Sequence, residues 1–588
     1  MFQSRTHTCN DLRIEHAGQA VTLTGWYENL RKVSKNLGFL ILRDFYGTTQ
    51  FVIETEEMME KLSGVNTEST LSITGVVRER SSKNPNLPTG DIEVVPEQIE
   101  VLGKCRYNEL PFEINRSKEA DENTRLRYRY LDLRNPAVKD RIILRCSVVA
   151  ELRKSMTDHG FLEITTPILT CSSPEGARDY LVPSRNHPGK FYALPQAPQQ
   201  FKQLLMTSGF DRYFQIAPCF RDEDARADRS PGEFYQLDME MAFATQEDVF
   251  AVLEDVLPPI FAKYGTYHTA SKAPFKRISF HEAMERYGSD KPDLRIDLTL
   301  TDAAACMEGC GFGPFEGQNV QAVVFSGFGA TRKVIDKMCA DVEVQTGNKA
   351  YWFRLDEKGE LVGGISKFLA DRKEAVVEAL SLKPGDFVGL AAGKKETAQK
   401  TAGVFRKILG NTVEGHMNKD CYEFCWIVDF PMYEIGEESG KLEFCHNPFS
   451  MPQGGMKDLL EKEPLDIYAY QYDLVCNGVE LSSGAVRNHD PEIMVKAFEL
   501  VGLGEEDVKA KFPAMYNAFC YGAPPHAGIA PGVDRMVMLI AGEESIREII
   551  PFPMNKTAQD VMMGAPAEVD PQQLKDVHIA VVKNDKVG

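Results

Sequence analysis

The sequence has no long apolar segment and no dense set of cysteines. No stretch reaches the roughly 18 apolar residues that a membrane-spanning helix needs. Residues 1–16 lack the apolar core of a secretory signal, so we expect no export. The 13 cysteines are odd in number, are spread over 588 residues and form no CxxC pair, which argues against a disulfide framework or a zinc site. We therefore expect a globular, cytoplasmic protein with reduced thiols.

Positive charge is also scarce. The chain has 67 Lys and Arg against 86 Asp and Glu, a formal net charge of -19. Taken alone, this excess argues against nucleic acid as a partner, because phosphate binding needs Lys and Arg. The basic residues are unevenly distributed, however: residues 1–45 carry six of them against four acidic ones, and residues 116–141 carry eight against five. These two segments are the candidates for an anionic partner.

The first hundred residues predict a small β-barrel. Segments rich in β-forming residues alternate with turns at 21–26, 38–43, 47–53, 71–77 and 91–95, with one acidic helical segment at 54–62. Five short strands and one helix suit a closed barrel of the OB type. Arg31, Phe39 and Gln50 lie on its first three strands, and a cation, a ring and an amide on one face are typical of single-stranded RNA binding. A solvated strand face explains the same three residues equally well.

The strongest pattern is a long antiparallel hairpin at residues 212–243. Two β-rich segments flank a polar loop that ends at Pro231-Gly232. Side chains alternate along a strand, so one face of the hairpin is predicted to carry the following polar and aromatic residues: Phe234, Gln236, Asp238, Glu240, Gln215 and Arg221. The opposite face is apolar and is expected to pack. A face with two carboxylates and an arginine is costly unless a ligand uses it; the alternative is an exposed polar face.

Two further segments predict groups that bind anions. Gly532-Val-Asp-Arg precedes an apolar helical run, which places Arg535 at a helix N-terminus, where free N–H groups and a guanidinium converge on an anion such as a polyphosphate. Residues 198–206 predict a helix that begins at proline. Gln199 and Lys202 are three residues apart on it and so face the same way.

Asp473 and Glu480 form a candidate metal site. An unbroken strand would direct these carboxylates to opposite faces, so we predict a bulge at Asn477-Gly478 that brings them to one side. Two carboxylates together with substrate phosphates make a magnesium site. Upstream, the pattern predicts a helix over 135–159 and a strand over 160–167 that ends at Pro167.

Together these segments resemble the motifs of class II aminoacyl-tRNA synthetases. The strand ending at Pro167, the hairpin with Arg221-Asp-Glu-Asp, and Gly532-Val-Asp-Arg resemble motifs 1, 2 and 3 in order. Residues 174–180, the helix with Gln199 and Lys202, and residues 288–295 make the chain similar to the bacterial-type aspartyl-tRNA synthetases over essentially its whole length.

The resemblance implies an α+β multidomain protein. The implied parts are an OB-fold anticodon-binding domain (1–105), a hinge (106–140), a class II catalytic domain with an antiparallel sheet and helices in two pieces (141–283 and 416–562), an inserted α+β domain (284–415) and a C-terminal extension (563–588). Members of this family are homodimers joined through motif 1, which we expect here around residues 161–167.

The implied reaction is ATP-dependent ligation of aspartate to the 3′ end of tRNA(Asp) through an aspartyl-adenylate. The residues that match the family's ATP site are Arg221, Glu223, Phe234, Glu480, Gly532, Asp534 and Arg535, of which Arg221, Arg535 and Glu480 are catalytic. The resemblance assigns the α-phosphate to Arg221 and the γ-phosphate to Arg535. It assigns Mg²⁺ to Asp473 and Glu480.

The resemblance also implies an aspartate pocket. Lys202 and Arg487 match the cations that clamp the side-chain carboxylate, with His446 as a further donor and Asp238 holding the lysine. Two more residues, Glu175 and Gln199, match positions at the α-amino end. In the barrel, Arg31, Phe39 and Gln50 match positions that stack on and read the central anticodon base. Some bacterial relatives also aspartylate tRNA(Asn), and the sequence leaves that activity open.

Three positions depart from the family. Ser482-Ser-Gly484 stands where a run of glycines usually follows the magnesium glutamate, Asn447 stands where a second histidine is common, and the motif 2 loop has an extra residue near Pro231-Gly232. The alternatives are an asparaginyl-tRNA synthetase, an aspartate–ammonia ligase, and an inactive RNA-binding paralogue. Residues 1–105 argue against the ligase, and the Lys202/Arg487 pair argues against the asparaginyl enzyme.

Overall fold

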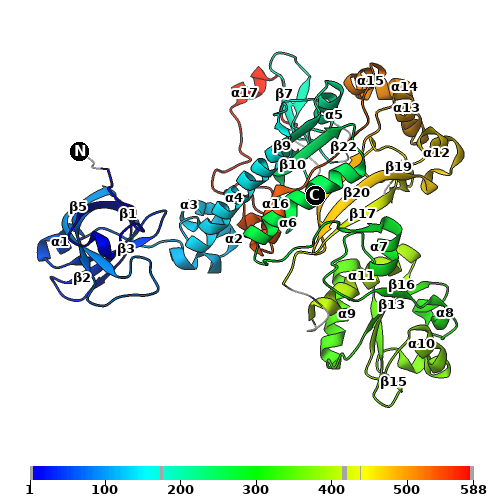
Figure 1. Cartoon of the computed structure of the whole chain (residues 1–588), viewed down its shortest axis with the longest axis horizontal. Coiled ribbons are helices and arrows are strands. Elements are labelled where there is room, and N and C mark those ends of the chain that lie inside the picture. The colour runs from blue at the N-terminus through cyan, green and yellow to red at the C-terminus, as the bar shows by residue number, and fades with distance from the viewer. Residues whose placement is uncertain (1–3, 173–176, 413–416, 418–419, 437–438, 583–588) are drawn as a thin grey trace. The chain divides into compact units, whose positions relative to one another are not determined.

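The chain divides into two compact units, Met1–Glu113 and Ile114–Gly588 (Figure 1). The computed structural model describes residues 4–172, 177–412, 417, 420–436 and 439–582. Among these residues, no helix has both the length and the apolar character needed to cross a membrane. The predicted hinge, 106–140, spans the division, because its residues from Ile114 onward belong to the second unit.

The first unit is a closed five-stranded barrel, as the sequence predicted. Its strands are β1 (Ala20–Lys32), β2 (Gly38–Arg43), β3 (Thr48–Ile53), β4 (Thr70–Glu79) and β5 (Ile92–Gly103), in the order β1-β2-β3-β5-β4. Helix α1 (Glu56–Lys61) begins at Thr55, whose side chain accepts a hydrogen bond from Met58 N. Alternate residues such as Leu40, Leu42 and Phe51 fill the interior, which leaves Phe39 and Gln50 on the outside.

The second unit is built on an eight-stranded sheet. The order is β11 (Lys276–Ser279), β17 (Phe424–Pro431), β20 (Tyr468–Cys476), β21 (Val479–Val486), β22 (His526–Ile529), β10 (Gly232–Ala242), β9 (Arg212–Arg221) and β6 (Leu162–Glu163). All neighbours are antiparallel except the outermost pair at each edge. Helices α4 (Pro136–Asp158), α6 (Gln246–Tyr264) and α16 (Val533–Ala541) share one large apolar core with the sheet.

The hairpin of β9 and β10 has the predicted faces. Leu237, Met239 and Met241 pack into the large core, whereas Asp238 and Glu240 alternate with them on the other side. The sheet therefore keeps one apolar face under helices and one polar face for a ligand. Helix α4 also agrees with its prediction: it begins at Pro136, with Asn135 as the N-cap.

Two sequence predictions were wrong in their details. The strand expected over 160–167 is only Leu162–Glu163, because only these two residues pair with β9 at the sheet edge; the last ladder contact is the hydrogen bond from Ile164 N to Phe214 O. Asn477 and Gly478 form a two-residue hairpin turn rather than a bulge, with φ of 52° and 78°. The register shift lies further along, where Leu474 and Val475 face Ser482 and Glu480.

The inserted segment forms its own five-stranded antiparallel sheet. The order is β12 (Leu300–Asp302), β13 (Asn319–Phe325), β16 (Phe387–Gly393), β14 (Ala350–Leu355) and β15 (Leu361–Val362). Alternate strand residues enter two separate cores, one with helices α9 (Arg332–Thr346) and α11 (Lys395–Thr412), the other with α8 (Ala304–Met307) and α10 (Lys373–Ala379). The sheet is therefore covered on both faces.

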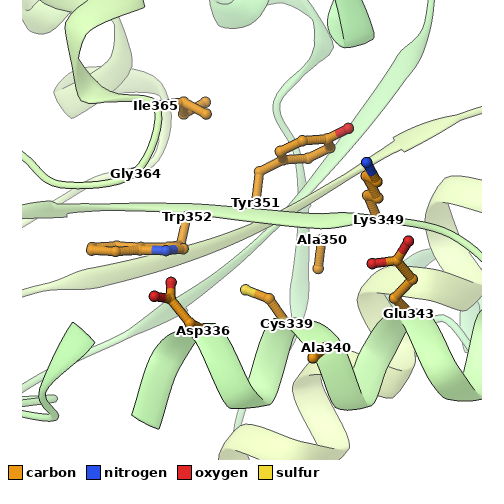
Figure 2. A pocket seen from close by; sticks show the side chains of 10 residues that line it. All are labelled: Asp336, Cys339, Ala340, Glu343, Lys349, Ala350, Tyr351, Trp352, Gly364 and Ile365. Atoms are coloured by element: carbon orange, nitrogen blue, oxygen red, sulfur yellow. The ribbon is translucent and has the colours of Figure 1, made fainter. Parts of the chain in front are cut away.

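A cavity of about 290 Å³ lies in this inserted domain, between α9 and β14. Figure 2 shows Asp336, Cys339 and Glu343 on α9 facing β14, which carries Trp352, and Lys349 just before that strand. None of the sequence motifs contributes a residue to it.

Smaller elements complete the second unit. They are α2 (Glu122–Arg127), α3 (Arg129–Asp132), α5 (Gln199–Thr207), α7 (Phe280–Tyr287), α12 (Gly455–Glu461), α13 (Pro491–Leu500), α14 (Glu505–Lys511), α15 (Pro513–Cys520), α17 (Pro571–Asp576), and the strand pairs β7 (Leu181–Pro183) with β8 (Phe191–Ala193) and β18 (Tyr433–Ile435) with β19 (Leu442–Phe444).

The inserted domain joins the main sheet through two glycines in close contact. Helix α7 ends at Gly288, which has a φ of 64° and packs against Gly403 in α11. A Cβ at Gly288 would lie 2.1 Å from Gln399 O, so this junction requires glycine for space as well as for conformation.

Gly288→Ala should destabilise the protein far more than Gly347→Ala. Both glycines end a helix with positive φ, but nothing lies within 4 Å of a Cβ at Gly347. We expect a cost of about 1–2 kcal/mol for Gly347→Ala from conformation alone, and about 1–3 kcal/mol more for Gly288→Ala from overpacking. Urea unfolding of the two variants measures the difference. Equal costs would contradict the close packing of α7 on α11.

Candidate active site

A cavity of about 490 Å³ opens on the polar face of the eight-stranded sheet. Its lining includes most of the site residues that the sequence predicted: Gln199, Lys202, Arg221, Glu223, Phe234, His446, Glu480, Arg487, Gly532, Asp534 and Arg535. These residues come from segments up to 336 positions apart (199 to 535), so the fold brings together what the sequence separates.

One end of the cavity is cationic and aromatic. The Arg221 guanidinium lies 5.0 Å from the centre of the Phe234 ring, and its buried Nε has no hydrogen-bond partner. Arg535 lies in the first turn of α16, and Glu223 in the motif 2 loop accepts a hydrogen bond from Arg229 at 2.5 Å. In this structure the Arg535 guanidinium pairs with Asp228 and Glu480. Two guanidinium groups beside a helix N-terminus suit a polyphosphate.

Asp534 is already engaged within the protein. Its carboxylate accepts hydrogen bonds from Arg145 on α4 and from Tyr235 N on β10, the latter at 3.0 Å. These contacts fix the N-terminus of α16 against the hairpin, which positions Arg535 at the cavity.

The other end of the cavity contains four buried charges. Lys202 Nζ lies 2.6 Å from Asp238 Oδ1 and 3.5 Å from Glu240 Oε2, and Arg487 Nε donates to Glu240 Oε1 at 2.9 Å. All four side chains are at most 3% exposed. The two cations are thus held by carboxylates of β10. The other oxygen of Asp238, Oδ2, has no hydrogen-bond partner.

A glycine makes this cluster possible. Strand β22 lies between β21 and β10, and a Cβ at Gly528 would sit 2.0 Å from Glu240 Oε2. Arg487, just after β21, therefore reaches Glu240 over a strand that has no side chain in the way.

The pKa values of the two carboxylates shift in opposite directions. Burial alone would raise the pKa of Glu240, but Arg487 and Lys202 hold it below its ordinary value. Burial raises the pKa of Asp238 despite Lys202, and Glu240 adds to that rise. Of the two carboxylates, Glu240 is therefore the one whose ionised form the surrounding cations favour.

A chain of amides fixes Gln199. Gln199 Nε2 donates to Gln203 Oε1 at 2.9 Å, and Gln203 Nε2 lies 3.0 Å from His526 Nε2. His526 Nδ1 is 2.8 Å from Pro524 O and must donate to it, so Nε2 is the acceptor. Burial lowers the pKa of His526, which keeps the ring neutral and this chain intact.

Asp473 and Glu480 share one side of the β20–β21 hairpin, as the metal hypothesis requires. Asp473 is 1% exposed and its Oδ2 has no partner. Burial and the Glu480 charge raise the pKa of Asp473. Glu480 Oε2 lies 3.3 Å from Lys291 Nζ, and Oε1 lies 3.6 Å from Arg535 Nη1.

The two serines that replace glycines lie in different surroundings. Ser482 is buried opposite Leu474 and its hydroxyl has no hydrogen-bond partner, whereas the Ser483 hydroxyl hydrogen-bonds to Asp473. Gly484 is retained where a Cβ would lie 2.5 Å from Gly528 O.

On the barrel, the three predicted residues share the outer face. The Arg31 guanidinium lies 4.9 Å from the centre of the Phe39 ring, its cross-strand neighbour. The Gln50 amide donates to Glu93 at 3.1 Å and accepts from Arg80 at 2.9 Å. These two partners were not foreseen, and they hold the Gln50 amide in one orientation.

Glu175, which the sequence predicted at the α-amino end, lies outside the described residues. Two other residues of the site had no predicted role. Glu240 was placed on the polar face of the hairpin but given no role, although its alternation with Asp238 was a usable signal. Lys291 lies within the segment 288–295, which helped the resemblance, yet only the fold shows that it reaches Glu480.

Comparison with known proteins agrees with this geometry. The protein-family model described as tRNA synthetases class II (D, K and N) matches residues 121–556, which is most of the chain. The chain belongs to the class II tRNA synthetases. The model of the OB-fold nucleic acid binding domain matches residues 21–102, where the structure has its barrel. Both the family resemblance and the fold class expected from the sequence are thereby confirmed.

Relatives of this synthetase match it along their whole length. A protein of Streptomyces avermitilis named aspartate–tRNA ligase is 52% identical, over 99% of each chain. A protein of Gluconobacter oxydans named aspartate–tRNA(Asp/Asn) ligase is 51% identical, over 99% of this chain and 98% of its own.

Solved structures share the fold of this synthetase at low identity. The asparaginyl-tRNA synthetase of Pyrococcus horikoshii with asparaginyl-adenylate superposes with a TM-score of 0.58 at 19% identity, covering 96% of this chain and 99% of its own. A putative aspartyl-tRNA synthetase of Leishmania major gives 0.60 at 20% identity, covering 94% of both chains.

Glu240→Gln should destabilise the synthetase by about 3 kcal/mol, because it leaves Lys202 and Arg487 with one buried carboxylate between them. Glu282→Gln is the matched control. Glu282 also pairs with an arginine, Arg286 at 2.7 Å, but on the surface, so its loss should cost less than about 1 kcal/mol. Urea unfolding measures both, and similar costs would contradict the burial of the cluster.

Proposed function

We propose that this class II synthetase activates L-aspartate with ATP and transfers the aspartyl group to the 3′ end of tRNA(Asp). The observation that carries the proposal is the pair of buried cations, Lys202 and Arg487, facing the same cavity as Arg221, Phe234 and Arg535. A dicarboxylic amino acid and a nucleoside triphosphate are the two ligands for which these groups are suited.

In the first step the α-carboxylate of aspartate attacks the α-phosphate of ATP. The new bond joins carboxylate oxygen to phosphorus, and the bond to the pyrophosphate oxygen breaks. No general base is needed, since the carboxylate is already ionised at neutral pH. The adenine stacks on Phe234, Glu223 meets its edge, Arg221 stabilises charge on the α-phosphate, and Arg535 holds the γ-phosphate. Catalysis is positioning and electrostatics.

Asp473 and Glu480 fit Mg²⁺ only together with the nucleotide. Among the described residues there is no cluster of three or more His, Cys, Asp or Glu side chains, so the protein does not form a complete cage. Asp473 Oδ2 is buried without a partner, and two carboxylates beside phosphate oxygens are the usual magnesium environment. The bound ion would neutralise charge on the leaving pyrophosphate.

Charge selects aspartate over asparagine. The two amino acids have almost the same shape, so a pocket of neutral groups could not separate them strongly. Lys202 and Arg487 keep donors available above Asp238 and Glu240, and a carboxylate satisfies them where an amide leaves them underused. Gln199 and Glu175 would receive the α-ammonium group, and His446 would add a donor at the cavity wall.

The barrel would bind the anticodon. Arg31 and Phe39 offer a cation and a ring on one outer face, and the oriented Gln50 amide can read a base edge. We extend the proposal to tRNA(Asn), since relatives about as similar bear the name of the dual-specificity enzyme.

The synthetase would act as a homodimer through motif 1. Large apolar side chains are exposed in motif 1, in the segments after it and just after β10: Leu162, Leu169, Leu181, Phe191 and Phe243 are 47–78% exposed. Burial of exposed apolar side chains is a reason for two protein surfaces to associate. Phe161, by contrast, is buried in the monomer and would support the interface from behind.

Lys202→Met should lower kcat/KM for aspartate in ATP–pyrophosphate exchange by at least about hundredfold, because it removes one cation of the clamp. Discrimination against asparagine should fall with it. Lys272→Met, at an exposed position, is the control and should behave as wild type. Wild-type discrimination in the Lys202 variant would contradict the assignment.

Phe39→Ala should weaken charging of tRNA(Asp) and leave exchange without tRNA unchanged. Loss of one stacked base is worth about 1–3 kcal/mol, which predicts a rise in KM for tRNA of roughly five- to 150-fold. Phe45→Ala removes a more exposed ring of the barrel and should have little effect. Equal losses in charging and exchange would contradict the barrel assignment, and the same assay with purified tRNA(Asn) measures the second activity.

A further inference from the structure

Lys291 lies beside the carboxylate pair that we propose to hold the metal. Its ammonium is 3.3 Å from Glu480 Oε2 and 2.5 Å from Asp290 Oδ2. Arg535 faces the other oxygen of Glu480, at 3.6 Å. Both oxygens of this carboxylate are therefore paired with side-chain cations.

The inserted domain fixes the segment that carries Lys291. Helix α11 supplies Arg406, whose guanidinium donates to the carbonyls of Asp293, Ile296 and Leu298 at 3.0, 2.7 and 2.5 Å. The close packing of Gly288 on Gly403 anchors the start of the same segment. Lys291 is thus held near its position by a packed loop and not only by its own ion pairs.

The same loop touches the hairpin that carries the two carboxylates. A Cβ at Gly478, in the turn between β20 and β21, would lie 3.2 Å from Asp293 Cβ. The loop that carries Lys291 therefore packs directly on the turn of the hairpin that carries Glu480.

We propose that Lys291 is a built-in cation that occupies the place of a divalent ion at Glu480 in the free enzyme and competes with that ion until ATP binds. The proposal rests on the proposed roles of Asp473 and Glu480. Two carboxylates alone give a divalent ion too few oxygen ligands, so Lys291 prevails at Glu480 when no nucleotide is present. ATP supplies further oxygens for the ion and draws Lys291 and Arg535 onto its phosphates.

This arrangement keeps the pair neutralised at every stage. Asp473 and Glu480 are near each other and one of them is fully buried, so leaving both without a cation would be costly. It also assigns the inserted domain a role, which is to support the loop that presents Lys291.

The test is Mn²⁺ binding to the full-length protein without nucleotide, followed by electron paramagnetic resonance. Lys291→Met should bind Mn²⁺ at least about tenfold more tightly than wild type, because one competing unit charge at 3.3 Å is removed. Lys291→Arg keeps the charge and should bind as wild type does. Lys373→Met is the matched control: the Lys373 side chain is about as exposed as that of Lys291 and pairs with Glu360 at 2.8 Å, but neither residue lines the active-site cavity.

In a second measurement, the Lys291→Met substitution should weaken binding rather than tighten it. With a non-hydrolysable ATP analogue and Mg²⁺, Lys291→Met should bind more weakly than wild type, because a cation for the phosphates is missing. Mn²⁺ binding by Lys291→Met that is equal to or weaker than wild type would overturn the proposal, as would tighter binding of the analogue. Absence of aspartate-dependent exchange in wild type would instead refute the proposed function, while the Mn²⁺ comparison would still report on Lys291.

Discussion

The buried cluster of Lys202, Asp238, Glu240 and Arg487 is the interaction on which the site depends. Two carboxylates on β10 hold a lysine from α5 and an arginine from the end of β21. A carboxylate ligand would find these cations already desolvated and oriented, so little rearrangement would be needed on binding. The cluster also joins parts of the chain that the inserted domain separates, since Glu240 precedes that domain and Arg487 follows it.

The sheet around the cluster leaves space for these charged side chains. Gly528 lacks the side chain that would block Glu240, and Gly484 allows β21 to lie close to β22. The apolar face of β10 packs under α4, α6 and α16. The polar face therefore does not have to supply apolar residues to this core. In this sense the core on one side of the sheet permits the costly collection of charges on the other.

The inserted domain is tied to the active site by geometry. Its helix α11 holds the loop 288–298 through Arg406 and Gly403, and that loop reaches Glu480 through Lys291. No residue from β12 to β16, all of which the structure describes, lines the large cavity. The inserted domain therefore acts on the cavity through the position of the loop.

The sequence by itself determined the barrel, the hairpin of β9 and β10, helices α4 and α16, and the family. Period-two alternation, turn residues and helix caps act over a few residues, so they can be recognised in the sequence without knowledge of the fold. The same local rules failed at residues 160–167 and at Asn477-Gly478. There, edge pairing and the hairpin register decided how many residues joined the ladder and where the shift lay.

Only the tertiary structure decided which charges meet. Alternation placed Glu240 on the polar face, but its pairing with Arg487 depends on β22 lying between their strands with glycine at 528. Lys291 and Glu480 are 189 positions apart, and their approach depends on how the inserted domain packs. Coulomb interactions depend on distance in space, which sequence spacing does not encode once the chain has folded across two domains.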